Sequence, residues 1–143
     1  MTVETNGIGF ADAFCNFLVS VIPGLVKGTN LFVNDIMETD LVEEDAFSVF
    51  EVSISGVVGS PIPHYNWEVR IVTSRPTQRA ARDAVFGIVD KILGKRPKII
   101  SDSGDKFFVK NIVTSEPGVV VSDVLNNGRF LGEASITVNA IPN

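Results

Sequence analysis

The stretch from Asn66 to Gly94 constrains the fold most, because its hydrophobic period changes once along its length. Over residues 67–72 apolar and polar side chains alternate, which is the period of a half-buried β-strand. From residue 80 onward the apolar positions recur at the spacing of a helix, and they are Ala80, Ala81, Ala84, Val85, Ile88, Val89, Ile92 and Leu93. Ser74 or Thr77 can cap the start of this helix, and Gly94 can end it. The sequence therefore predicts one strand that leads directly into one amphipathic helix.

A second amphipathic helix is expected near the N-terminus. Its apolar stripe repeats at helical spacing, and Pro23-Gly24 would end it; the stripe consists of Phe10, Ala13, Phe14, Phe17, Leu18 and Val21. Cys15 lies beside the stripe, and we interpret it as a small buried residue because no basic neighbour in the sequence would lower its pKa. Residues 1–9 are polar and contain two glycines, so we expect a flexible N-terminus followed by a single domain over 10–143.

The other segments read mainly as strands and turns. We expect strands at 31–33, 46–55, 107–113, 119–121 and 130–141. Turns or loops are expected at 35–45, 56–65, 97–106, 116–118 and 126–128. The predicted order is α-β-β-β-α-β-β. This order indicates an α+β fold, with a mainly antiparallel sheet of about four to five strands and two helices packed on one face.

Composition restricts the class of protein. With 143 residues, of which 45% are hydrophobic, the chain can bury one substantial core. The net charge of −5 argues against nonspecific binding of nucleic acid by the whole domain. Its single cysteine excludes an internal disulfide and is compatible with a reducing cytoplasm. The longest mostly apolar run, 10–26, is interrupted by polar residues and Pro23, so we expect a core helix and no membrane contact. No basic segment precedes an apolar one at the N-terminus, so we expect no signal peptide.

Residues that could carry chemistry are scarce. His64 is the only histidine and lies beside prolines, so we interpret it as a packing or surface residue. No nucleophile elbow, phosphate-binding loop or dinucleotide-binding motif occurs. The carboxylates at 40–45 lack the spacing of a calcium loop, and 101–105 reads as a polar turn. The sequence therefore predicts no catalytic residue, no cofactor and no metal, and hence a protein that is not an enzyme.

Charge is strongly segregated along the chain. Acidic residues with no basic residue among them occupy the region 35–51, namely Asp35, Glu38, Asp40, Glu43, Glu44, Asp45 and Glu51. Basic residues concentrate in the central strand–helix unit and just after it. Two ordinary solvated faces would explain this pattern. The functional interpretation is a subunit interface in which the helix of one copy meets the acidic loop of the next, through Arg75, Arg79, Arg82, Asp40, Glu43, Glu44 and Asp45.

Several of these segments, taken in order, resemble one protein family. The run Gly28–Val33, then Phe47–Val52, then a Gly/Pro-rich loop that ends at Tyr65, is similar to tail terminators of tailed bacteriophages and related minor capsid proteins. The strand Val69–Arg75 with its Ala-rich helix fits the same pattern. So do the Glu116-Pro117 turn, Asp123, Asn127-Gly128-Arg129 and the final strand. The resemblance covers roughly residues 10–141. One departure is Thr73-Ser74, where the family often has a basic residue.

The resemblance implies a structural virion protein. Members form a homo-oligomeric ring, usually a hexamer, which caps the tail tube at its head-proximal end and stops tube polymerisation. The implied partners are other copies of the chain, the tail tube protein and a head-completion or connector protein. Genomic DNA would pass through the lumen without sequence-specific binding, and an acidic ring suits that passage because it would not retain phosphates. Assembly would take place in the host cytoplasm.

Two other interpretations remain open from the residues. One is a small α+β module that binds a ligand or regulates a partner without catalysis. The other is an enzyme that uses the acidic loop 40–45 with a metal ion. A fold class alone does not decide among these functions.

Overall fold

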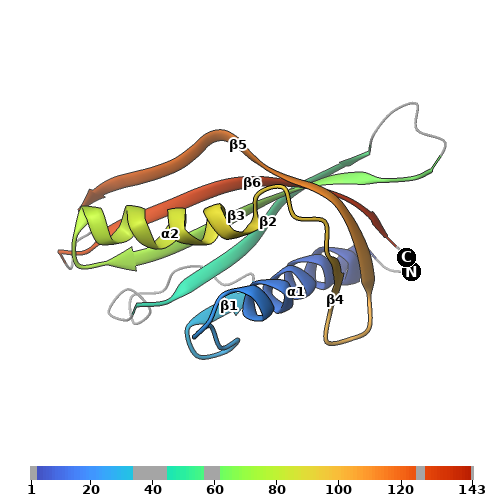
Figure 1. Ribbon diagram of the computed structural model, residues 1–143, viewed down its shortest axis with the longest axis horizontal. Coiled ribbons are helices and arrows are strands. Elements are labelled where there is room, and N and C mark those ends of the chain that lie inside the picture. Colours follow the sequence, from blue (N-terminus) through green and yellow to red (C-terminus); the bar gives the residue numbers. More distant parts are fainter. Residues whose placement is uncertain (1–2, 34–44, 57–61, 125–127, 143) are drawn as a thin grey trace.

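The computed structural model describes residues 3–33, 45–56, 62–124 and 128–142. Over these residues the chain forms, in order, α1 (Val3–Val21), β1 (Leu31–Val33), β2 (Phe47–Gly56), β3 (Tyr65–Arg75), α2 (Gln78–Ile92), β4 (Lys98–Ile100), β5 (Lys106–Val124) and β6 (Phe130–Pro142). Figure 1 shows both helices on the same side of one twisted sheet. The predicted α+β class is therefore confirmed, with one more short strand than we expected.

The sheet has the strand order β1-β2-β3-β6-β5-β4 among the described residues. Its long central strands pair antiparallel, with Val69 opposite Ile136 and Val72 opposite Glu133 in the β3–β6 register. Of the described strands, only β1 pairs parallel, alongside the start of β2. Because side chains alternate along a strand, one face of this sheet carries the core, and neither of the two described helices covers the other face.

The core lies between the helices and the covered face of the sheet. Trp67 is its largest fully buried side chain, and its ring stacks on Phe10 of α1 with centroids 4.4 Å apart. Phe107 of β5 meets both rings edge-on. The predicted stripe of α1 is buried almost completely, and Cys15 is fully buried, as expected. Burial raises the pKa of the Cys15 thiol to about 12, which keeps it protonated and unreactive as a nucleophile.

The central strand–helix unit forms as predicted. Thr77 is the N-cap of α2, and its hydroxyl accepts a hydrogen bond from the Ala80 amide at 3.1 Å. Gly94 follows the last turn with φ of 75°, a conformation that glycine adopts without strain. Close packing of α2 depends on Gly132 of β6, because a Cβ there would lie 2.6 Å from the Ala81 carbonyl oxygen. This glycine lets the helix backbone approach the sheet.

Helix α1 begins at Val3, well before the expected start at Phe10. The two early glycines do not end the helix. A Cβ on Gly9 would lie 2.6 Å from Asp105 Oδ2, so this position brings α1 against the β4–β5 turn. A small residue here serves close packing rather than a chain break.

The prediction of a turn at Glu116–Gly118 is wrong, because β5 runs through it as one strand. Thr114 pairs with Ile136 and Val119 pairs with Ala134, so the four residues 115–118 lie opposite Ser135 alone. This is a large β-bulge, and it accommodates a proline that cannot donate to a ladder and a glycine with φ of 80°. Strand pairing with the long β6 outweighs the local turn signal.

The short strand β4 was missed within the predicted polar connection 97–106. It pairs antiparallel with the first residues of β5, and its central residue, Ile99, is buried. Three residues are too few to show a periodic pattern. The predicted polar turn 101–105 is confirmed as the β4–β5 connection, in which the Ser101 hydroxyl accepts a hydrogen bond from the Asp105 amide at 3.0 Å.

Candidate functional site

The predicted interface residues separate into two groups around α2. Arg75 and Asp45 meet within one chain, with Arg75 Nη1 3.7 Å from Asp45 Oδ2. Arg79 and Arg82 lie on the exposed surface of α2. Asp40, Glu43 and Glu44, also predicted to take part, fall outside the described residues, so their part in an interface stays a prediction.

Asp45 is held by a second arginine that the sequence analysis did not select. Arg129 Nη2 donates to Asp45 Oδ1 at 2.9 Å and to the Ser74 carbonyl oxygen at 2.7 Å, while its Nε donates to the Ser74 hydroxyl at 2.9 Å. Only 15% of its side chain is exposed. Arg129 therefore joins the start of β6 to the start of β2 and the end of β3.

Arg75 belongs to the same cluster. Its guanidinium lies over the Phe47 ring, 4.9 Å from the centroid, and its Nε donates to the Thr73 hydroxyl at 2.9 Å. Burial lowers the pKa of Arg75, and the nearby positive charge of Arg129 acts in the same direction, against the opposing effect of Asp45. We call Asp45, Arg75 and Arg129 the paired cluster. Its charges are used within the subunit.

The other side of α2 forms a groove with the second half of β5. A hollow of about 430 Å³ is lined by Gln78, Arg79, Arg82 and Val121. A second hollow of about 400 Å³ follows it along the helix and is lined by Arg82, Asp83, Phe86 and Val119. Because Arg82 lines both, we treat them together as the α2–β5 groove. It combines arginine side chains with an apolar wall.

Phe86 is the residue of this groove that sequence reasoning passed over. It lies outside the apolar stripe of α2, and 56% of it is exposed. A large aromatic side chain on the polar side of a helix is a usable signal of an interaction surface. Val119 and Val121 had only been expected as part of a short strand, and nothing local to them indicates a groove with α2.

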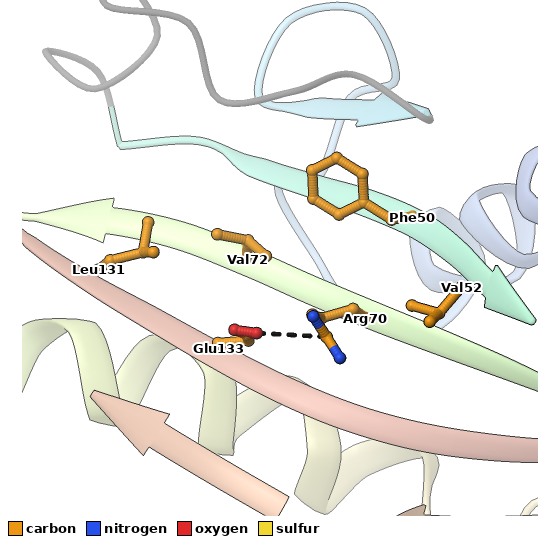
Figure 2. Close-up of a pocket in the computed structure, with 6 residues that line it drawn as sticks. All are labelled: Phe50, Val52, Arg70, Val72, Leu131 and Glu133. Carbon is orange, nitrogen blue, oxygen red and sulfur yellow. Dashed lines mark ion pairs between the residues drawn. The ribbon is translucent and has the colours of Figure 1, made fainter. Parts of the chain in front are cut away.

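A third candidate surface lies on the face of the sheet opposite α1 and α2. Figure 2 shows a shallow hollow there, of about 320 Å³, lined by Phe50, Val52, Arg70, Val72, Leu131 and Glu133. At its centre Arg70 and Glu133 form an ion pair at 3.2 Å. The apolar side chains around this pair come from β2, β3 and β6.

A charge network on α1 has a structural role. Lys27 Nζ donates to Asp12 Oδ1 at 2.5 Å and to Asp102 Oδ2 at 2.7 Å, and the Asp102 amide donates to Asp12 Oδ2 at 2.7 Å. Burial lowers the pKa of Lys27, but hydrogen bonds to Asp102 and Asp12 and the charges of both carboxylates outweigh it and raise the pKa overall. The same hydrogen bond from Lys27, followed by one from Asn16, lowers the pKa of Asp102. These contacts fasten α1 to the β4–β5 turn.

No cluster of three or more potential metal ligands occurs within the described parts of the chain. His64 is partly buried, with its Nδ1 3.2 Å from Asn139 Oδ1, which agrees with its interpretation as a packing residue. No described helix has both the length and the apolar character needed to cross a membrane.

No protein-family model matches this sequence, and a comparison with curated proteins finds no match either. Among solved structures, the fold is similar to a chain in the virion of a native gene transfer agent particle. That similarity has a TM-score of 0.53, covers 94% of this chain and 88% of the other, and comes with 12% sequence identity. At this identity the two chains share a fold over nearly their whole lengths, and the fold is what the comparison establishes.

Proposed function

We propose that this protein is a structural component of a phage-like virion. The observation that carries the proposal is the near full-length fold similarity to a chain of a gene transfer agent virion. The sequence resemblance to tail terminators points independently to the same class of particle. The fold similarity and the sequence resemblance each extend over most of this chain, so neither depends on a single motif.

Within that class, the specific role we propose is tail termination. Copies of the chain form a ring, with six subunits as the family implies, on the head-proximal end of the tail tube. The ring stops addition of tube subunits and presents a surface to the head-completion protein, and DNA passes through its lumen. The protein acts by binding and has no catalytic step.

The surfaces around α2 and on the open sheet face support an assembling protein. Apolar side chains there are partly exposed, including Phe86 and Val52. Exposed apolar groups beside charged ones are typical of surfaces that become buried between proteins. A ring subunit needs at least two such surfaces, because each copy contacts two neighbours.

Electron microscopy of particles that lack this protein tests the proposed role. Loss of a terminator should give overlong tails or tails without heads, and supplying the wild-type protein should restore normal tails. Normal virions in its absence would refute the proposal. Sedimentation of the purified protein at high concentration and low salt adds a second measurement, in which ring-sized particles are expected.

A further inference from the structure

Among the described side chains, the α2–β5 groove carries positive charge with no ion pair to a carboxylate on another element. Helix α2 has no acidic residue in its first turn, and the helix dipole adds positive potential there. Arg82 has one ion pair in the described structure, with its sequence neighbour Asp83 at 3.5 Å, and both side chains are about 60% exposed. Such an exposed pair contributes little, so Arg82 and Arg79 are available to an acidic partner.

The groove also has an apolar wall and an open strand edge. Phe86 projects from α2, and Val119 and Val121 come from β5. In the described structure β4 pairs with β5 only over residues 106–108, so the edge of β5 beside the groove bonds no other described strand. A partner with acidic and apolar side chains in one segment would match these features.

The chain itself contains a segment of that chemistry. Residues 35–45 read DIMETDLVEED, with six carboxylates, no basic residue and four apolar residues. Its last residue, Asp45, is fixed by Arg75 and Arg129 next to β2. Figure 1 shows β2 and β5 on opposite sides of α2. Because β3 and β6 lie between them, the two strands are roughly 14 Å apart at ordinary strand spacing.

We propose that the α2–β5 groove binds the acidic segment 35–45 of a second copy of this chain. The anchor of the segment and the groove lie toward opposite edges of the sheet, so the contact joins two different surfaces. A contact between different surfaces repeats head to tail, and it closes into a ring when the rotation between copies allows. The inference rests on the proposed ring and identifies the two surfaces that would meet in it.

Charge exchange between two variants tests the pairing. The groove variant is Arg79→Glu/Arg82→Glu, and the segment variant is Glu43→Lys/Glu44→Lys. Each alone should assemble about tenfold or more weakly than wild type at low salt, because like charges then face each other. An equimolar mixture should recover assembly, since each groove then meets a segment of opposite charge on the other variant. Sedimentation velocity measures both results.

The groove variant should keep its fold, because glutamate near a helix N-terminus is favourable. A matched control is Lys91→Glu/Lys95→Glu, which changes the net charge equally. Lys91 follows Arg82 by nine residues, about two and a half turns, and so lies on the opposite side of α2. This control should assemble like wild type. Circular dichroism checks that all variants are folded.

The same variants, added to particles that lack the protein, separate this inference from the proposed function. Recovery of normal tails by wild type and by the mixture, but by neither single variant, supports both. Normal tails with the groove variant alone would overturn the inference and leave termination intact. A mixture that stays unassembled while a chain with all four changes assembles would place the contact within one chain, against the inference. Normal tails without any of the proteins would refute termination itself.

Discussion

Arginine side chains lie on both sides of α2, but their interactions differ. On the β2 side, Arg75 and Arg129 converge on Asp45, and they also bond the hydroxyls of Thr73 and Ser74. On the β5 side, the arginines of the α2–β5 groove reach no carboxylate on another element of the described structure. Partly buried charges that pair across elements hold the subunit together, whereas exposed charges with no partner on another described element can recognise another molecule.

The largest expected effect on stability comes from Gly132, which lets α2 pack closely on the sheet and so positions the residues on both sides of the helix. In Gly132→Val, the new side chain would meet the Ala81 backbone, so α2 must move from the sheet. We expect a loss of about 3 kcal/mol or more in the free energy of unfolding, measured by urea denaturation. Gly87→Ala is the matched control, because nothing lies within 4 Å of its Cβ position and alanine favours a helix. That change should stabilise the protein by about 0.5–1 kcal/mol.

The next largest effect tests whether the arginines on the β2 side of α2 stabilise the subunit more than those on the β5 side. Arg129→Met removes two hydrogen bonds to the buried Ser74 and one to the more exposed Asp45. It should cost about 2 kcal/mol of unfolding free energy. Arg79→Met on the exposed side should change stability by no more than about 0.5 kcal/mol. Equal losses in the two variants would remove the distinction between the two sides.

Glu51 of β2 provides a contrast with the arginine pairs, because folding disfavours its charged form. Burial raises the pKa of Glu51 to about 7, although the nearby Trp67 indole opposes the shift. An acid with a raised pKa binds more protons when folded, so its stabilising contribution is complete below about pH 4.5 and is lost as pH rises through 7. Because Glu51 is only partly buried and solvent screens its charge, Glu51→Gln should stabilise the protein by only about 1 kcal/mol at pH 8.

Near pH 5, Glu51→Gln should be about as stable as wild type, because the wild-type carboxyl is then largely protonated in the fold. Thermal unfolding of both proteins from pH 5 to 8 measures the difference. A constant gap between them across that range would show that the Glu51 carboxyl does not titrate there.

The smallest effect concerns Phe86 in the isolated subunit. Because 56% of it is exposed, Phe86→Ser should leave subunit stability within about 0.5 kcal/mol. Its effect on assembly should be larger, since the same side chain lines the α2–β5 groove. Comparing urea unfolding with sedimentation separates the two. A large loss of stability without a change in assembly would assign Phe86 to the core instead.

Sequence reasoning succeeded where the signal is local. The period change within 66–94, the Thr77 cap and the buried stripe of α1 were all predicted, and the structure confirms them. It failed at Glu116–Gly118, where a local turn signal competes with a long pairing partner. Of the candidate interface, it selected Arg79 and Arg82 from charge, and their role in assembly stays a prediction. It missed Phe86, because a single aromatic on a polar face leaves the helical period unchanged.

The amino-acid sequence by itself determined the class of fold, the central strand–helix unit and the separation of acidic from basic segments. Each of these follows from periodicity, capping or composition within a short window. Tertiary structure alone decided which charges are paired. Arg129 reaches Asp45 across 84 positions, and β5 meets α2 only because the sheet order places them together. Such contacts depend on which strands become neighbours, a property of the whole chain that no local pattern records.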